Sequence, residues 1–364
     1  NPSTNTVYKG LERFVDFQPD VIIALGGGSA MDAAKAMWMF FEHPDVSFFG
    51  AKQKFLDIRK RTYKIPYAEK TTFICIPTTS GTGSEVTSFA VITDSETHIK
   101  YPLADYALTP DIAIVDPALV MSVPASVTAD TGMDVLTHAI ESYVSVMASD
   151  YTRGLSLQAI KLVFENLEHS YRFGDEESRE KMHNASTMAG MAFANAFLGI
   201  NHSLSHKLGG WFHIPHGTAN ALLAPYVCKF NAQRHPYHMG TFSQYKYPQA
   251  FERYVELGEL IGVKGKNDEE TFKNWIKALE QLKADIDIPP TICDWLCEAH
   301  PEKSAEDWEK EFLAAVDQMS EWAFHDACTG ANPVYPMIGE LKQVYLRAFY
   351  GDDKFIEKYG DVLC

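Results

Sequence analysis

Several features that mark membrane, secreted or nucleic-acid-binding proteins are missing from this sequence. The longest apolar stretch, at residues 191–200, is interrupted by Asn195 and is too short to span a bilayer. Nothing at the N-terminus resembles a signal peptide, because a charged segment followed by an apolar run is absent. No basic stripe is long enough to follow a phosphate backbone, and the formal net charge of -16 works against polyanionic partners. We therefore expect a protein that binds neither membranes nor nucleic acid.

Cysteine is also scarce and shows no pattern. The 364 residues include six cysteines, and none has the spacing of a zinc knuckle or a disulfide framework. This usage is typical of a protein kept in the reducing cytoplasm, which is the location we expect. The first residue is Asn1 and not Met, which indicates a piece of a longer protein or a processed product.

The residues that are present divide into two parts of different character. In the first third, short apolar runs predict strands at residues 21–25, 73–76, 89–93 and 112–115. A helical pattern at residues 31–41 lies between the first two. After residue 117 the periodicity becomes helical, with helices predicted near residues 125–145, 155–168, 177–198, 218–231, 248–261, 269–283 and 305–324.

This pattern predicts an α/β fold followed by an all-α fold. We expect a Rossmann-like dinucleotide-binding domain at residues 1–117, an all-helical domain at residues 118–364, and the active site in the cleft between them. A doubly wound dinucleotide domain usually needs about six strands, and the sequence predicts four. The α/β domain is therefore expected to be truncated, with strands missing before Asn1.

A glycine-rich loop follows the first predicted strand. Gly26, Gly27, Gly28 and Ser29 lie between that strand and the next helix. Consecutive glycines let the backbone approach a ligand closely, and the start of a helix favours an anion such as a pyrophosphate. The alternative is a tight strand-to-helix turn, and the spacing differs from the G-x-G-x-x-G fingerprint.

A second polar loop follows the next predicted strand. Residues 78–85, TTSGTGSE, carry five hydroxyl groups and two glycines, which suit phosphate and ribose oxygens. A Ser/Thr-rich surface turn is the alternative. Both loops lie at the C-terminal ends of predicted strands, where open α/β sheets bind ligands, so together they favour a dinucleotide site.

Carboxylate and imidazole side chains recur at helical spacing in the second part. Asp134 and His138 lie four residues apart, as do His202 and His206, and His216 follows ten residues later. Each pair alone is more often a surface hydrogen bond than a metal site. Together, one carboxylate and several imidazoles without a thiolate suit Fe²⁺, Zn²⁺, Mn²⁺ or Co²⁺ at a catalytic site with an open position. Spacing alone leaves His206 in the ligand set beside His202.

Four blocks of the sequence match one family: GGGSAMDAAK, PTTSGTGSEVT, GMDVLTHAIESY and NHSLSHKLGGWFHIPHG. They resemble the iron-containing, group III alcohol dehydrogenases in order and in distance, over nearly the whole chain. The segments FLDIRKRTYKIP, KYPLADYALTPDIAIVDP, AFANAFLGINHSLSHKLG and CTGANPVYP are similar to the dehydrogenase half of bifunctional aldehyde–alcohol dehydrogenases. The resemblance implies a dehydroquinate synthase-like arrangement, in which a nucleotide-binding domain precedes a helical metal-binding domain.

The resemblance also implies roles for individual residues. The family's iron ligands fall on Asp134, His138, His202 and His216, with zinc as the alternative metal. His206 matches a family histidine that lies near the nicotinamide and does not bind the metal. For the cofactor, which similarity to the bifunctional enzymes implies is NAD, the matching residues are Gly27, Gly28, Ser29, Thr78, Thr79, Thr82 and Lys100.

The implied reaction interconverts acetaldehyde, or another short aldehyde, and NADH with ethanol and NAD in fermentation. The metal would polarise the aldehyde oxygen, and His206 would relay the proton. The aldehyde dehydrogenase half of the bifunctional enzymes has no counterpart in this chain. A small aldehyde or alcohol is the expected partner, and we expect a homo-oligomer that forms filaments in the full-length protein.

Two alternatives remain open at this point. A metal- and NAD-dependent lyase of the dehydroquinate synthase type has the same two-domain plan, but it needs basic residues for an anionic sugar phosphate. The metal region offers mainly Lys207 and apolar neighbours such as Phe193, Phe197 and Leu198, which shape either a substrate pocket or the core. The second alternative is an assembly segment of a filament-forming enzyme.

Overall fold

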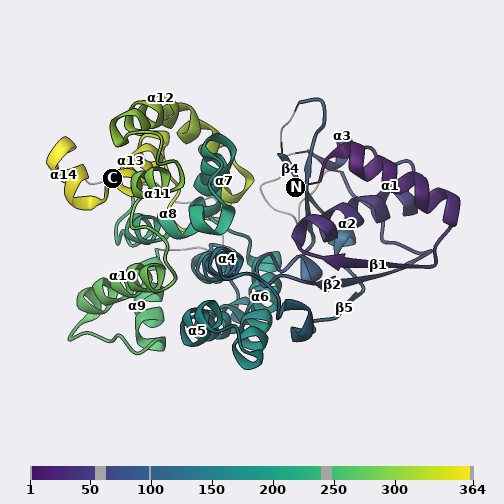
Figure 1. Ribbon diagram of the computed structural model, residues 1–364, viewed down its shortest axis with the longest axis horizontal. Helices are drawn as coiled ribbons and strands as arrows, with labels where there is room; N and C mark the ends of the chain where they lie inside the picture. Colours follow the sequence, from purple (N-terminus) through teal and green to yellow (C-terminus); the bar gives the residue numbers. More distant parts are fainter. Residues whose placement is uncertain (1, 54–62, 98–99, 239–247, 361–364) are drawn as a thin grey trace.

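The computed structural model describes residues 2–53, 63–97, 100–238 and 248–360. Figure 1 shows an α/β part formed by the first third of the chain beside a larger helical part formed by the rest. Residues 55–62, which belong to the segment FLDIRKRTYKIP, lie outside the described residues.

Three parallel strands form the centre of the α/β part. The strands β1 (Val21–Gly26), β2 (Thr72–Pro77) and β5 (Ile112–Ala113) lie in the order β1-β2-β5. In the pairing of β1 with β2, Val21 lies opposite Thr72 and Gly26 opposite Pro77. The two strands therefore end together, and the glycine-rich loop and the hydroxyl-rich loop leave the sheet at the same edge.

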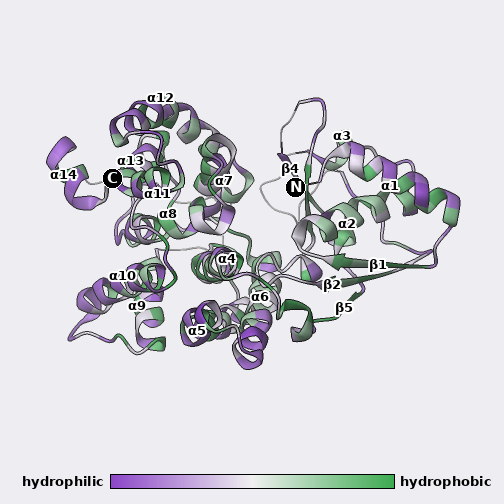
Figure 2. Cartoon of the chain, in the orientation of Figure 1, coloured by the Kyte–Doolittle hydropathy of each residue, from purple (hydrophilic) through white to green (hydrophobic). Residues whose placement is uncertain are grey.

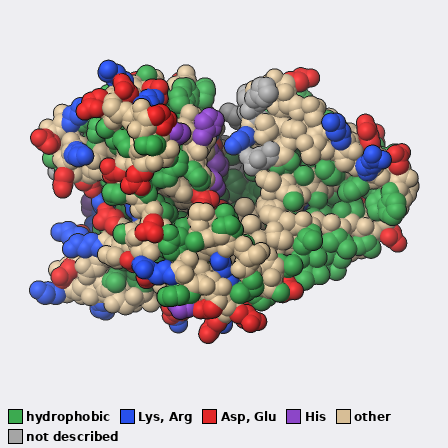
Figure 3. Space-filling view, in the orientation of Figure 1, with side chains coloured by type: hydrophobic (Ala, Val, Ile, Leu, Met, Phe, Trp, Pro, Cys, Tyr) green, Lys and Arg blue, Asp and Glu red, His purple; other side chains and the backbone are tan. Residues whose placement is uncertain are grey.

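Helices cover one face of this sheet. The helices α1 (Thr4–Phe17) and α2 (Gly28–Glu42) pack against each other, and α2 contacts β1 and β2 (Figure 1). Buried side chains on alternate positions of the strands join Trp38 and Phe41 of α2 in one apolar cluster. On the opposite face, the alternate residues Val21, Ile23 and Leu25 of β1 are 46%, 61% and 58% exposed. Figure 3 shows hydrophobic side chains gathered over this part of the molecule.

The strand predicted at residues 89–93 belongs to a different sheet. The strand β3 (Phe89–Thr93) pairs antiparallel with β4 (Lys100–Ala104), which the sequence did not predict, so three of the four predicted strands form the parallel sheet. The carboxylate of Asp94 accepts hydrogen bonds from the backbone N–H groups of Glu96 and Thr97, which begins the turn between β3 and β4. A short apolar run does not show whether its partner is parallel or antiparallel. Four short helices also belong to this part of the chain: α3 (Phe48–Ala51), η2 (Ser84–Val86), η3 (Tyr106–Leu108) and η4 (Pro117–Val120).

The helical part begins with α4 (Ala125–Val144) and encloses one large apolar core. It continues through α5 (Asp150–Arg172), α6 (Glu176–Ala196), α7 (Ile200–Phe212), α8 (His216–Asn231), α9 (Ala250–Leu260), α10 (Asp268–Asp285), α11 (Ile292–Ala299), α12 (Ala305–Phe324), η5 (Ala327–Ala331), α13 (Ile338–Tyr350) and α14 (Asp352–Tyr359). Trp275, Tyr345 and Phe312 are among its fully buried side chains. Figure 2 shows hydrophilic residues along the outward sides of α5, α10 and α12. Within the described ranges, none of the helices combines the length and the apolar character that a membrane crossing requires.

A short non-helical turn, which the sequence did not predict, separates α6 from α7. The helix predicted at residues 177–198 ends at Ala196, and Phe197 has a φ of 61°, in the left-handed region that a residue with a Cβ rarely adopts. Gly199 then precedes α7, and a Cβ built on it would lie 2.6 Å from Oδ1 of Asn332 and 2.9 Å from Oε1 of Glu141. His202 therefore lies in the first turn of a new helix.

Candidate metal and cofactor site

Three helices bring the predicted metal ligands together. Asp134 and His138 lie one turn apart on α4, His202 lies in the first turn of α7, and His216 is the first residue of α8. The start of α8 is fixed against α4, because the carboxylate of Asp130 accepts hydrogen bonds from the backbone N–H (2.7 Å) and the hydroxyl (3.0 Å) of Thr218.

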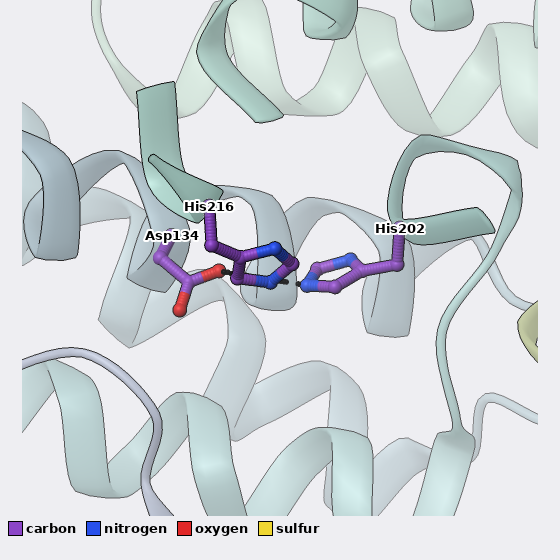
Figure 4. A group of neighbouring side chains, drawn as sticks. All are labelled: Asp134, His202 and His216. Carbon is purple, nitrogen blue, oxygen red and sulfur yellow. Dashed lines mark ion pairs between the residues drawn. The ribbon is translucent and has the colours of Figure 1, made fainter. Parts of the chain in front are cut away.

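The imidazoles surround one carboxylate oxygen. Oδ1 of Asp134 lies 3.7 Å from Nε2 of His138, 3.5 Å from Nε2 of His202 and 3.4 Å from Nε2 of His216. Asp134, His202 and His216 offer ligand atoms that all lie within 4.8 Å of one another, and His138 is not in this group of three (Figure 4). Two ligand atoms at about 2.1 Å from one tetrahedral metal ion are about 3.4 Å apart, so the spacings of Oδ1 from Nε2 of His202 and of His216 fit a single ion, with His138 at the edge of the group.

The electrostatics of the group favour a cation. Burial alone would raise the pKa of Asp134, but the neighbouring His138 and His216 outweigh burial and hold that pKa well below its ordinary range. Burial lowers the pKa of His138 to about 4, so its imidazole is neutral near pH 7. Burial would also lower the pKa of His202, yet Glu141 and Asp134 raise it to about 9. One carboxylate beside three imidazole rings is a suitable donor set for Fe²⁺, and binding of the ion would displace the proton of His202.

Two further polar residues, which the sequence analysis did not identify, contact these side chains. Glu141 lies one turn beyond His138 on α4, and its Oε2 is 2.5 Å from Nδ1 of His202. The amide nitrogen of Asn220 donates to Oδ1 of Asp134 at 2.9 Å and lies 3.3 Å from Nε2 of His202. Glu141 could have been found from its spacing of seven residues after Asp134, which places both on one helix face. No local pattern indicates Asn220.

His206 faces a different carboxylate. Its Nδ1 lies 3.1 Å from Oδ2 of Asp326, which also accepts a hydrogen bond from Nζ of Lys207 at 2.7 Å. Burial would raise the pKa of Asp326, but His206 and Lys207 keep it well below its ordinary range. The ring of His206 stacks on that of His216, with centroids 5.4 Å apart. His206 is therefore beside the group around Asp134 while its Nδ1 is engaged elsewhere.

Asp326 also forms a second group of metal-binding residue types, with His206 and Cys328. Burial raises the pKa of the Cys328 thiol well above its ordinary value, so the sulfur stays protonated. The amino group of Lys207 already supplies positive charge to the carboxylate. This second group is less suited to a metal ion than the group around Asp134.

The two predicted cofactor loops touch each other. Gly27 is the N-cap residue of α2, so no side chain caps the start of this helix, and Gly28 is its first residue. A Cβ on Gly28 would lie 2.7 Å from Cγ2 of Thr82, and one on Gly27 would lie 3.3 Å from Oγ1 of Thr79. The unsubstituted backbone at the start of a 15-residue helix thus lies beside threonine hydroxyls, a combination that suits a pyrophosphate.

Buried charges hold these loops in place. The carboxylate of Asp32 on α2 accepts hydrogen bonds from the Ser84 hydroxyl at 2.7 Å and the Val91 N–H at 2.9 Å. The amino group of Lys35, also on α2, donates to the backbone carbonyls of Thr87 and Phe89. Of the remaining predicted cofactor residues, Ser29 is the second residue of α2 and Thr78 directly follows β2, whereas Lys100 begins β4 with an exposed side chain.

A hollow separates the two parts of the molecule. Figure 3 shows it between the α/β part and the helical part, with histidine side chains gathered on the helical wall. The glycine-rich loop and the hydroxyl-rich loop leave the parallel sheet at the end where β1 and β2 stop, and η2 contacts α6 of the helical part.

Comparisons with known proteins identify the family. The family profile described as "Iron-containing alcohol dehydrogenase" matches residues 1–117, and that described as "Fe-containing alcohol dehydrogenase family, C-terminal" matches residues 128–349. The chain belongs to the iron-containing alcohol dehydrogenase family. Membership of this family does not favour the lyase or the assembly segment that the sequence left open.

Individual relatives agree with this assignment. The aldehyde–alcohol dehydrogenase of Streptococcus pneumoniae serotype 2 is 53% identical over 352 residues, which are 96% of this chain and 39% of that protein. The chain thus spans about two fifths of the length of that relative. The solved iron-containing alcohol dehydrogenase of Thermococcus thioreducens superimposes with a TM-score of 0.81 and 35% identity, covering 97% of this chain and 83% of the other. Sulfoacetaldehyde reductase from Bifidobacterium kashiwanohense, solved in complex with NAD⁺, has a TM-score of 0.76 and 29% identity over 97% of this chain and 82% of the other.

Proposed function

We propose that this chain reduces a short aldehyde, acetaldehyde foremost, to its alcohol with NADH, and that it catalyses the reverse reaction. Residues 1–117 would bind the nicotinamide cofactor and residues 118–364 would bind Fe²⁺ through Asp134, His138, His202 and His216. The observation that carries the proposal is the arrangement of three imidazole Nε2 atoms within 3.7 Å of one buried carboxylate oxygen. The aldehyde substrate is inferred from the name of the 53% identical aldehyde–alcohol dehydrogenase.

The bound groups supply the chemistry that side chains cannot. Fe²⁺ stabilises negative charge on a carbonyl or hydroxyl oxygen as a Lewis acid, and the nicotinamide gives or takes the hydride. The chain's residues hold these groups in place: the four ligands fix the ion, and the loops that begin at Gly27 and Thr78 hold the cofactor phosphates.

In this proposal His206 transfers the proton that aldehyde reduction consumes. Reduction of an aldehyde by NADH consumes one proton for each hydride, and oxidation of the alcohol releases it. Because Nδ1 of His206 faces Asp326, that nitrogen carries the hydrogen and Nε2 is left to accept or donate a proton. The His206 side chain is 40% exposed, so it can exchange that proton with solvent.

An apolar wall beside His138 suits a small uncharged substrate. The ring of Phe193 stacks on the imidazole of His138 with centroids 4.4 Å apart, and Phe89 lies against both Phe193 and Phe197. These rings belong to a buried cluster that also contains Leu198. Such a wall excludes water and offers no partner for the phosphate of a sugar phosphate.

The test is oxidation of NADH driven by acetaldehyde, with NADPH assayed in parallel. The chain is purified without oxygen and reconstituted with Fe²⁺, beside His202→Ala and the control His300→Ala, whose side chain is 41% exposed. We expect iron-dependent turnover in the wild type and the control, and loss of both iron and turnover in His202→Ala. A folded, iron-loaded chain without turnover, or a His202→Ala variant with normal turnover, would overturn the proposal.

A further inference from the structure

Glu141 is a buried carboxylate with both oxygens engaged. It lies on α4, is 4% exposed, and follows His138 by one helical turn. Leaving a carboxylate in the protein interior is costly unless hydrogen bonds or charges compensate it. The hydrogen-bond partners of Glu141 therefore explain why this carboxylate is buried.

One oxygen holds the imidazole of His202. Oε2 of Glu141 is 2.5 Å from Nδ1 of His202, so the two atoms are joined by a hydrogen bond. A carboxylate can only accept, so Nδ1 must carry the hydrogen. In a neutral imidazole this leaves the lone pair on Nε2, the atom that lies 3.5 Å from Oδ1 of Asp134.

The other oxygen holds the helix that carries His202. Oε1 of Glu141 accepts a hydrogen bond of 2.7 Å from the backbone N–H of Asn201, in the first turn of α7. That N–H has no partner within the helix, because the first four N–H groups of a helix are unpaired. Gly199 permits this approach, since a Cβ there would lie 2.9 Å from the same Oε1. One carboxylate thus fixes both the ring of His202 and the backbone beneath it.

We propose that Glu141 is a positioning residue of the metal centre, which fixes the orientation and the tautomer of His202 so that Nε2 is presented to the ion. The inference rests on the metal site assigned under the proposed function. Carboxylates that accept from a ligand imidazole orient the ligand, and their removal typically weakens metal binding by about 10- to 100-fold.

Glu141→Gln tests the tautomer directly, because the two side chains have nearly the same shape. A glutamine has one acceptor oxygen and one NH₂ group for two partners. If its oxygen keeps the Asn201 N–H, its NH₂ faces Nδ1 of His202 and forces the hydrogen onto Nε2, where it blocks the metal. Glu165→Gln on α5, where the side chain is 54% exposed, is the matched control.

The measurements are the dissociation constants of Fe²⁺ and Co²⁺, determined without oxygen, and the visible absorption spectrum of the Co²⁺-loaded protein. We expect Glu141→Gln to bind both ions at least about tenfold more weakly than the wild type and Glu165→Gln, and to show a changed Co²⁺ spectrum at saturation. A purely structural role would lower the melting temperature of the metal-free protein and leave both metal readouts unchanged.

Three variants distinguish a failure of the positioning role from a failure of the metal site. Wild-type affinity and spectrum in Glu141→Gln, with metal binding lost in His202→Ala, would overturn the positioning role and leave the site intact. Wild-type metal binding in His202→Ala would overturn the site itself. If Glu141→Gln does not fold, Glu141→Asp decides by the same assays, because its shorter side chain keeps the charge but cannot reach both Nδ1 of His202 and the N–H of Asn201.

Discussion

Gly217 controls how closely α8 approaches α4, and therefore where His216 lies. Gly217 directly follows His216, and a Cβ built on it would lie 1.7 Å from the backbone oxygen of Asp130. Real Cβ contacts are essentially never shorter than 3.0 Å, so Gly217→Ala must move the two backbones apart by at least 1.3 Å. The clash is with backbone, which cannot rotate away as the end of a flexible side chain can.

This displacement exceeds what a metal site tolerates. Ligand distances in metal sites agree with their ideal values to within about 0.2 Å, and Asp134 lies only one turn beyond Asp130 on α4. We expect Gly217→Ala to weaken Fe²⁺ binding by about 100-fold or more. Overpacking should also lower the free energy of unfolding of the metal-free protein by about 1–3 kcal/mol.

Equilibrium dialysis against Fe²⁺ without oxygen, with circular dichroism and thermal unfolding, measures both effects. Gly154→Ala is the matched control, because Gly154 lies within α5 and nothing is within 4 Å of a Cβ built there. That control should bind iron normally and gain about 0.5–1 kcal/mol of stability. Normal iron affinity in a folded Gly217→Ala variant would refute the reasoning, since the site would then not depend on the approach of α8 to α4.

Three further predictions concern proton transfer, burial and substrate size. Asp326→Asn should lower turnover by about tenfold or more at unchanged iron content, because its single amide oxygen cannot serve His206, Lys207 and the Cys328 N–H together; steady-state rates and metal analysis test this. Burial lowers the pKa of Lys283 from its ordinary 10.5 to about 8, so the folded chain binds fewer protons than the unfolded chain between these values. The free energy of unfolding of the wild type, measured relative to that of Lys283→Met, should therefore rise by up to about 3 kcal/mol as the pH rises from about 8 to about 10.5. Urea titrations that give the same difference between the two proteins at every pH would contradict this. Phe193→Ala should raise the ratio of kcat/KM for butanal over acetaldehyde by about tenfold, because it opens the wall beside His138, and an unchanged ratio would remove Phe193 from the substrate pocket.

Local patterns were sufficient for much of the fold. The strand predicted at residues 21–25 is β1, and the helices predicted at 125–145 and 305–324 agree with α4 and α12 to within one residue at each end. A buried parallel strand ending in glycine and a long helix with a continuous apolar side leave strong local signals. The end of α6 at Phe197 left no local signal in the sequence. Phenylalanine does not favour a left-handed backbone, so packing with the rest of the protein stabilises it there.

Local spacing likewise predicts only some of the residues at the candidate site. The spacing of four residues places Asp134 and His138 together, since both lie on one helix. Spacing alone left His206 in the ligand set beside His202, because residues four apart on one helix share a face. The resemblance excluded His206 from the ligands, and in the structure its Nδ1 faces Asp326, 120 residues away in sequence. Contacts between residues so far apart follow from the packing of α7 against η5, which no local pattern encodes.

The central claim is that one metal ion lies between α4, α7 and α8. X-ray diffraction from crystals grown without oxygen and loaded with Fe²⁺, with data collected on both sides of the iron absorption edge, locates that ion directly. We expect one anomalous peak between Asp134, His138, His202 and His216, within about 2.3 Å of Oδ1 of Asp134 and of Nε2 of His202 and His216. A peak between His206, Asp326 and Cys328, or no ordered iron in crystals of protein that binds iron in solution, would contradict it.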